Sequence, residues 1–114
     1  MGSLYYGSSS EPIQIPDSLL AHVKVVLTTK FRRKERLTLS LVTPGSSQGG
    51  RTTLWLDPSI PLRFVFDSAD APALDGTLLR QLADAANSVR GLVIELDSVE
   101  QQRALEAPVL AAVG

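Results

Sequence analysis

Apolar residues recur along this chain with two different periods, one of two residues and one close to the helical repeat. Short apolar runs at residues 4–6 and 13–15 flank the glycine- and serine-rich residues 7–10, a pattern that predicts a β-hairpin. From residue 18 to about 34, the apolar side chains fall within one broad arc of a helix. We expect Asp17 to cap this helix, because its side chain can accept from backbone N–H groups of the first turn.

Alternation with a period of two returns after the first helix and predicts three strands. They are expected at residues 37–41, 51–56 and 61–66, with a flexible loop over 43–50. A second apolar stripe with helical spacing covers about 76–87, and we expect Asn87 or Gly91 to supply the left-handed residue that ends it. A last strand is predicted at 92–96.

These elements follow one another in the order ββ-α-βββ-α-β, which predicts an α+β fold. In this fold, two helices cover one face of an antiparallel sheet, and the strand leucines face inward. We expect a single domain over residues 1–97 and a C-terminal extension over 98–114. The extension begins with Ser98-Val99-Glu100-Gln101, a capping-box pattern that predicts a short helix to about residue 107. The apolar residues after it are expected to be loose or docked on a partner.

The composition fits one small globular domain. With 114 residues, of which 44% are hydrophobic, the chain can build one core without disulfides or metals. It has no cysteine, which excludes disulfide scaffolds, thiol catalysis and cysteine-based zinc sites. No apolar run approaches the roughly 20 residues that cross a bilayer, and the first residues lack the pattern of a secretory signal. We therefore expect a cytoplasmic protein with no membrane partner.

Basic residues gather around the end of the first predicted helix, although the net charge of the chain is only −1. Between residues 24 and 36, six cations stand against the single acid Glu35, whereas residues 57–106 carry nine acids against four arginines. The six cations are Lys24, Lys30, Arg32, Arg33, Lys34 and Arg36. Such a cluster can neutralise the phosphates of a nucleic-acid backbone. The same cations also complement the negative end of the helix dipole, and Lys30 falls within the apolar arc, from which its long side chain can reach water.

None of the patterns that mark an active site stands in the sequence. The glycine-rich residues 44–50 lead into a strand and not a helix, which favours a hairpin connection over a phosphate-binding loop. His22 is the only histidine, and we interpret it as a residue at the edge of the core that hydrogen-bonds a neighbour. Asp67 and Asp70 are interpreted as solvated carboxylates. We expect no catalytic residue, no metal site and no cofactor, and an enzyme is the less favoured interpretation.

Trp55 is the aromatic residue whose environment the pattern leaves open. Phe31, Phe64 and Phe66 all fall on the core faces of predicted elements. Trp55 shares a strand face with Thr53. Packing in the core is favoured for its indole, and the alternative is an aromatic platform on which the bases of a single strand stack.

Several stretches of the sequence resemble a small uncharacterised family of actinobacteria and their phages. They are residues 1–7, 20–26, 30–35, 86–88, 91–92 and 50–66, the last of which contains the run Trp-x-x-Pro-Ser-Ile-Pro-Leu. The resemblance covers about residues 1–97. Members of that family are of unknown function, and many carry an automatic label of ATP-dependent DNA ligase. The resemblance thus implies an association with DNA transactions, by analogy alone.

The residues themselves do not support a ligase activity. A DNA ligase forms a lysyl adenylate at a Lys-x-Asp-Gly motif, and the only Asp-Gly pair of this chain, Asp75-Gly76, is preceded by Ala73-Leu74. The chain is also too short for a nucleotidyltransferase domain.

Two hypotheses from different classes follow for the function. The first is a non-catalytic accessory domain that contacts the backbone of DNA or RNA through the six basic residues, with Trp55 as an additional aromatic contact. The alternative is a protein-interaction or self-associating module without nucleic acid, which forms a homo-oligomer or binds another protein. It would use the C-terminal extension or the exposed sheet face around Thr38, Ser40, Trp55 and Val65.

Overall fold

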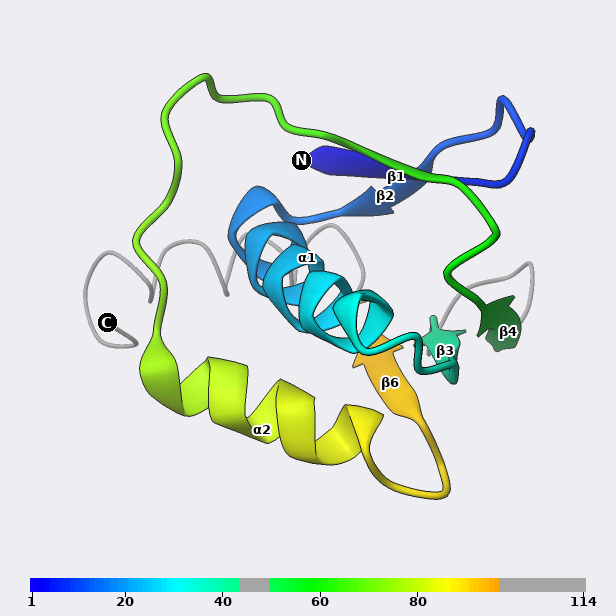
Figure 1. The fold of residues 1–114 in the computed structure, drawn as a ribbon. Helices are drawn as coiled ribbons and strands as arrows, with labels where there is room; N and C mark the ends of the chain where they lie inside the picture. The colour runs from blue at the N-terminus through cyan, green and yellow to red at the C-terminus, as the bar shows by residue number, and fades with distance from the viewer. Residues whose placement is uncertain (44–49, 97–114) are drawn as a thin grey trace.

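Two helices and six strands make up the part of the chain that the structure describes, which is residues 1–43 and 50–96 of a computed structural model (Figure 1). The strands form two three-stranded sheets. Sheet A has the order β2-β1-β5 and consists of β1 (Gly2–Tyr6), β2 (Ile13–Ile15) and β5 (Leu62–Val65). Sheet B has the order β4-β3-β6 and consists of β3 (Leu37–Val42), β4 (Arg51–Leu56) and β6 (Leu92–Glu95). The helices are α1 (Asp17–Arg32) and α2 (Gly76–Ala86).

The predicted class and element order are confirmed, whereas the strands are arranged differently from the single antiparallel sheet that the sequence suggested. β5 pairs with β1 and not with β4, because a tight turn at Asp57–Ile60 redirects the chain and Pro61 has no N–H to extend the β4 ladder. β6 runs parallel to β3, since α2 lies in the connection before β6 and carries the chain back to the starting end. The helix predicted up to residue 107 lies outside the described residues.

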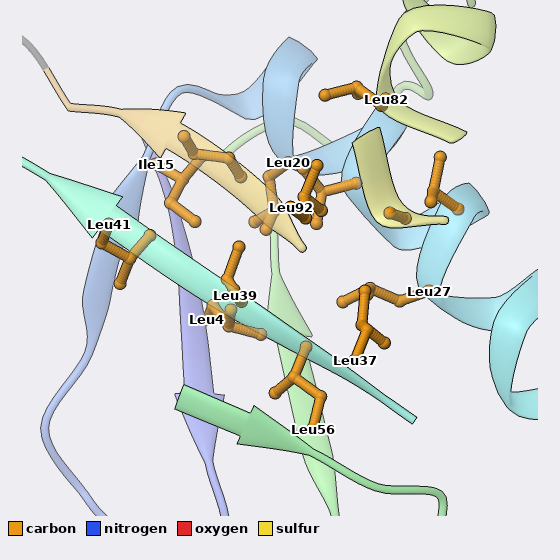
Figure 2. Packing of buried hydrophobic residues seen from close by; sticks show 14 residues of the cluster. Leu4, Ile15, Leu20, Leu27, Leu37, Leu39, Leu41, Leu56, Leu82 and Leu92 are labelled. Carbon is orange, nitrogen blue, oxygen red and sulfur yellow. The ribbon is translucent and has the colours of Figure 1, made fainter. Parts of the chain in front are cut away.

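Side chains from both sheets and from α1 meet in one core (Figure 2). Its fully buried members include Leu4 and Ile15 of sheet A, Leu39, Leu56 and Leu92 of sheet B, and Leu20, Val23 and Leu27 of α1. The strand leucines therefore face inward, as the alternation predicted, and the three phenylalanines pack partly buried against the same core. α2 buries only Leu82 and Ala86 and packs beside α1. α1 is thus the central helix, and the residues at its end take their positions from it.

The carboxylate of Asp17 does not cap α1, so that prediction is wrong. The N-cap residue is Pro16, which has no side-chain acceptor. Asp17 accepts instead from the backbone N–H groups of Asp67 and Ser68, at 3.0 and 3.2 Å. These two bonds hold the segment after β5 against the start of α1, and they occupy the oxygen that a cap would have used.

His22 is buried in α1, and both of its ring nitrogens bond to the backbone. Nδ1 lies 2.6 Å from the carbonyl oxygen of Ser18, and Nε2 lies 2.8 Å from the amide nitrogen of Asp75. Because a carbonyl only accepts and an amide N–H only donates, the ring is the neutral tautomer with its proton on Nδ1. His22 thereby fixes Asp75, whose carboxylate caps α2 by accepting from the N–H of Thr77 at 2.9 Å.

Gly91 turns the chain into β6 with a φ of +76°, and it lies against β3. A Cβ at this position would stand 2.2 Å from Oγ1 and 2.7 Å from the carbonyl oxygen of Thr38. The other residue considered for a left-handed role, Asn87, has a φ of −88°. Of the two candidates, only Gly91 is therefore left-handed, and it shapes the entry to β6 and does not end α2.

We expect Gly91→Ala to lower the free energy of unfolding by about 3 kcal/mol, because the new methyl group would overlap Thr38 in a backbone conformation that side chains disfavour. Gly76→Ala is the matched control, since its Cβ would meet no atom within 4 Å. We expect the control to change stability by less than about 1 kcal/mol, in the stabilising direction. Urea unfolding followed by far-ultraviolet circular dichroism measures both variants, and equal stability of the two would contradict the close contact at Gly91.

Replacement of His22 should loosen the start of α2. We expect His22→Leu to cost about 2–3 kcal/mol of unfolding free energy, because it leaves the Asp75 N–H without an acceptor and removes the second hydrogen bond to the Ser18 carbonyl. His22→Gln retains an acceptor for Asp75 and should lose less. Amide hydrogen exchange at Asp75 is the site-specific readout, and unchanged protection in the leucine variant would show that the imidazole does not hold this amide.

Candidate functional site

The six basic residues singled out by the sequence separate into a paired and an unpaired set. Lys30 and Arg36 each form an ion pair with a carboxylate of the same chain. The other four are exposed and have no carboxylate partner within residues 1–43 and 50–96. They are Lys24, Arg32, Arg33 and Lys34. The predicted cluster therefore remains a basic surface, but two of its members have a charge that the fold already compensates.

Lys30 points inward from α1 and joins the ends of the two helices. Only 9% of its surface is exposed. Its Nζ lies 2.7 Å from Oδ1 of Asn87, directly after α2, and 3.0 Å from Oε1 of Glu35. A buried ammonium needs such partners, because the loss of its hydration must be compensated by hydrogen bonds and charge. We call this contact the Lys30–Asn87–Glu35 bridge.

Arg36 is held just before β3 by the carboxylate of Asp57, which follows β4. Arg36 donates from Nε to Oδ2 of Asp57 at 2.5 Å. The other carboxylate oxygen accepts from the backbone N–H and the hydroxyl of Ser59, at 2.9 and 2.7 Å. The bonds from Ser59 and then the one from Arg36 lower the pKa of Asp57, since they all favour the ionised carboxylate. The pair therefore stays ionised at neutral pH.

The end of α1 is a Schellman turn with a lysine in the left-handed position. The N–H of Lys34 donates to the carbonyl of Phe31 at 2.9 Å, and the N–H of Glu35 donates to that of Lys30 at 3.1 Å. Lys34 has a φ of 59°, the conformation for which this motif normally uses glycine. The turn stops α1 at Arg32 and leaves the side chains of Arg33 and Lys34 exposed beyond it.

The four unpaired cations follow the outer side of α1 and its end. Lys24 and Arg32 are both exposed on α1 and eight residues apart, which corresponds to about 12 Å along the axis and about 80° around it. The Nζ of Lys24 stands 5.7 Å from the centroid of the Phe66 ring, a cation–π contact that leaves its charge uncompensated. Arg33 and Lys34 extend the set past the last turn. We call these four residues the cationic stripe.

Trp55 lies on β4 with 53% of its surface exposed, so the favoured expectation that it packs in the core is wrong. Its neighbour across the ladder is Thr38 of β3. The carbonyl oxygen of Trp55 accepts a hydrogen bond of 2.6 Å from the hydroxyl of Tyr6 in β1. This bond links the two sheets and fixes the backbone from which the indole projects.

Two shallow depressions lie on either side of the Lys30–Asn87–Glu35 bridge, and both are lined by Lys30 and Asn87. The first has a volume of about 280 Å³ and includes Arg33 and residues of both helices. The second has a volume of about 270 Å³ and includes Arg36 and Trp55. The structure thus brings Trp55 into one depression with Arg36 and Lys30, whereas Arg33 of the cationic stripe lines the other one. No local pattern marks Asn87 as more than a helix end, because its partner Lys30 is 57 positions away.

The four residues proposed as a protein-contact surface do not all lie on the same sheet. Thr38, Ser40 and Trp55 lie on one face of sheet B, whereas Val65 belongs to sheet A. Ser40 is buried, and its hydroxyl lies 2.9 Å from that of Thr53. The exposed apolar side chain beside Trp55 is that of Val89 and not that of Val65. Val89 lines the same depression as Trp55 and is fully exposed.

The described residues contain no group of histidine, cysteine, aspartate and glutamate side chains that could hold a metal ion. Both ring nitrogens of His22 form hydrogen bonds with backbone groups, so neither is free to exchange a proton with a substrate. Asp67 and Asp70 are both exposed. The carboxylate of Asp67 is not simply solvated, because it pairs with the N-terminal ammonium group at 2.7 Å. Within the same part of the chain, no helix is long and apolar enough to span a membrane.

The contribution of Asp57 to stability should depend on pH in one direction. Its pKa is lowered on folding from 3.8, so its contribution is complete above that value and is lost as the pH falls through the lower value of the folded state. We expect the difference in urea midpoint between the wild type and Asp57→Asn to be constant from neutral pH to about pH 5 and to shrink below about pH 4. Asp84→Asn, at an exposed carboxylate of α2, is the control and should show little difference at any pH.

Comparison with known proteins places this chain in a family without assigning a function. No curated protein matches the sequence, and no solved structure matches the chain. Residues 1–97 match the family model described as a domain of unknown function, DUF7882. Because this match covers most of the chain and all the residues of the cationic stripe, the chain belongs to the DUF7882 family.

Proposed function

We propose that this chain is a non-catalytic accessory domain that binds the phosphate backbone of nucleic acid through the cationic stripe. The observation that carries the proposal is that four cations follow one helix and its end without a carboxylate partner in the described part of the chain. Phosphates supply the missing negative charge, and the release of their counterions favours binding. Lys30 and Arg36 contribute through structure and not through direct contact, since their charges are already paired.

The conformation of Lys34 is a second observation in favour of this surface. A left-handed φ disfavours a side chain by about 1–2 kcal/mol, and glycine would avoid that cost. A lysine at this position keeps a cation at the end of α1 at the expense of stability. Strained positions that stability does not require are typical of functional sites.

No feature of the described residues favours sequence-specific recognition, because no helix-turn-helix is present in them and the stripe offers charge alone. We therefore propose binding that depends on salt and not on base sequence. The link to DNA transactions rests on the resemblance to actinobacterial and phage proteins that carry a ligase label.

A protein-interaction module is the second candidate. It is favoured by the exposed side chains of Trp55 and Val89 around one depression, because neighbouring exposed apolar side chains are typical of contact surfaces. Size-exclusion chromatography with light scattering at low and high salt tests its self-associating form. A monomer at every concentration would contradict that form.

Charge reversal at the end of the stripe should weaken binding strongly. We expect the wild type to bind a fluorescent 20-mer, duplex or single strand, with a slope of log K against log salt of about −3, as four phosphate contacts imply. Arg32→Glu/Arg33→Glu/Lys34→Glu should lower the affinity at least tenfold at low salt, measured by fluorescence anisotropy. The matched control is Arg51→Glu/Arg63→Glu/Arg80→Glu, which changes the net charge equally at exposed arginines outside the stripe and outside the depression beside Trp55. Equal loss in both triple variants, or no binding by the wild type, would contradict the proposal.

Lys34→Gly separates binding from stability in the same assay. Glycine relieves the left-handed strain, so the variant should unfold at a higher urea concentration than the wild type. It also removes one cation, so its affinity should fall severalfold and its salt slope should become shallower by about one. Loss of affinity in a more stable protein cannot be attributed to unfolding.

A further inference from the structure

The indole of Trp55 is exposed on a backbone that is held in place. β3 pairs with β4 on one side, and the hydroxyl of Tyr6 binds the Trp55 carbonyl on the other, at 2.6 Å. Within the described residues, no ring and no cation stacks on the indole itself. An exposed aromatic ring on a fixed strand can accept a flat partner without having to be ordered first.

The depression beside Trp55 offers polar groups together with this ring. It has a volume of about 270 Å³ and includes Arg36, Lys30 and Asn87. The Oδ1 atom of Asn87 is used by Lys30, and its amide nitrogen is a hydrogen-bond donor without a partner among residues 1–43 and 50–96. A flat ring system with acceptor atoms at its edge, such as a nucleobase, matches an indole face beside an amide donor.

The depression beside Trp55 shares two of its lining residues with the neighbouring depression, which the cationic stripe reaches. Lys30 and Asn87 line both this depression and the neighbouring one, and Arg33 of the cationic stripe lines the latter. A nucleotide with its base on Trp55 would therefore have its phosphate next to the basic end of α1. Aromatic rings beside a positively charged groove are the usual means of binding single strands, whereas a duplex does not offer the face of a base.

We propose that Trp55 is a stacking platform for one unpaired base, and that the preferred ligand of this domain is single-stranded nucleic acid. This inference rests on the proposed function and specifies its ligand. The base stacks on the indole, the amide of Asn87 faces the edge of the base, and the cationic stripe binds the adjoining phosphates.

Trp55 is the only tryptophan of the chain, so its fluorescence reports on this site alone. We expect a 12-mer of thymidylate to quench the emission of the full chain on titration at low salt. A 12-mer of the same backbone without bases should bind through its phosphates alone, about tenfold more weakly and without the quenching that stacking causes. The corresponding 12-base-pair duplex should bind without quenching as well.

Variants of Trp55 separate the ring from the charge. Trp55→Leu should lose about tenfold in affinity for the thymidylate 12-mer and little for the abasic one, as anisotropy of labelled strands measures. Trp55→Phe keeps an aromatic face and should recover most of the affinity. Both variants replace a half-exposed side chain, and their circular dichroism and urea midpoints check that the fold is retained.

The outcomes distinguish the two proposals. Equal affinity for the thymidylate and abasic strands without quenching would overturn the stacking role and leave backbone binding intact. Binding of neither strand would overturn both proposals. A change of emission with protein concentration alone, together with loss of a dimer in Trp55→Leu, would assign the indole to an interface between two copies of the chain and would also overturn the stacking role.

Discussion

The arrangement around the end of α1 depends on the contacts of the Lys30 ammonium group with Asn87 and Glu35. The Lys30 side chain leaves α1 on the side of the core, and its ammonium group can be buried only because Asn87 and Glu35 supply oxygen atoms at 2.7 and 3.0 Å. The bridge ties the end of α2 to the end of α1, and it holds Glu35 directly after the left-handed turn at Lys34. As a result, the neighbouring Arg32, Arg33 and Lys34 face solvent and cannot all be compensated by the nearest acid.

The ion pairs of this domain separate the cations that stabilise the fold from those whose charge is available to a ligand. The six basic residues look equivalent in the sequence, and a count of charges gives them equal weight. In the structure, Glu35 and Asp57 compensate Lys30 and Arg36. The remaining positive surface is smaller than the sequence indicated, but it follows one helix, so its charges are held at defined spacings.

Local patterns predicted the elements well because burial repeats with the period of each element. The alternating leucines of β3 and the apolar arc of α1 gave their correct positions and inward faces. The partition into two sheets could not be predicted, because the pairing of β5 with β1 joins residues about 60 positions apart and no local pattern encodes it. The exposure of Trp55 was missed for a similar reason. A strand pattern separates two faces, but whether the second face is covered depends on distant segments. The Asp17 cap failed because backbone N–H donors from elsewhere in the chain, those of Asp67 and Ser68, take the same carboxylate.

The bond between Tyr6 and Trp55 has a consequence for how copies of this domain can meet. The N–H of Thr43 donates to the carbonyl of Gly50, and alternate pairs of an antiparallel ladder exchange such bonds, so the backbone of Trp55 points away from Thr38 toward the outer side of β4. An outer strand with free carbonyls is a template for another strand. The hydroxyl of Tyr6 already donates to the Trp55 carbonyl, so this carbonyl cannot accept a hydrogen bond from a strand of another molecule. Tyr6 of sheet A therefore hinders the addition of a further strand to the outer edge of β4 when the protein is concentrated.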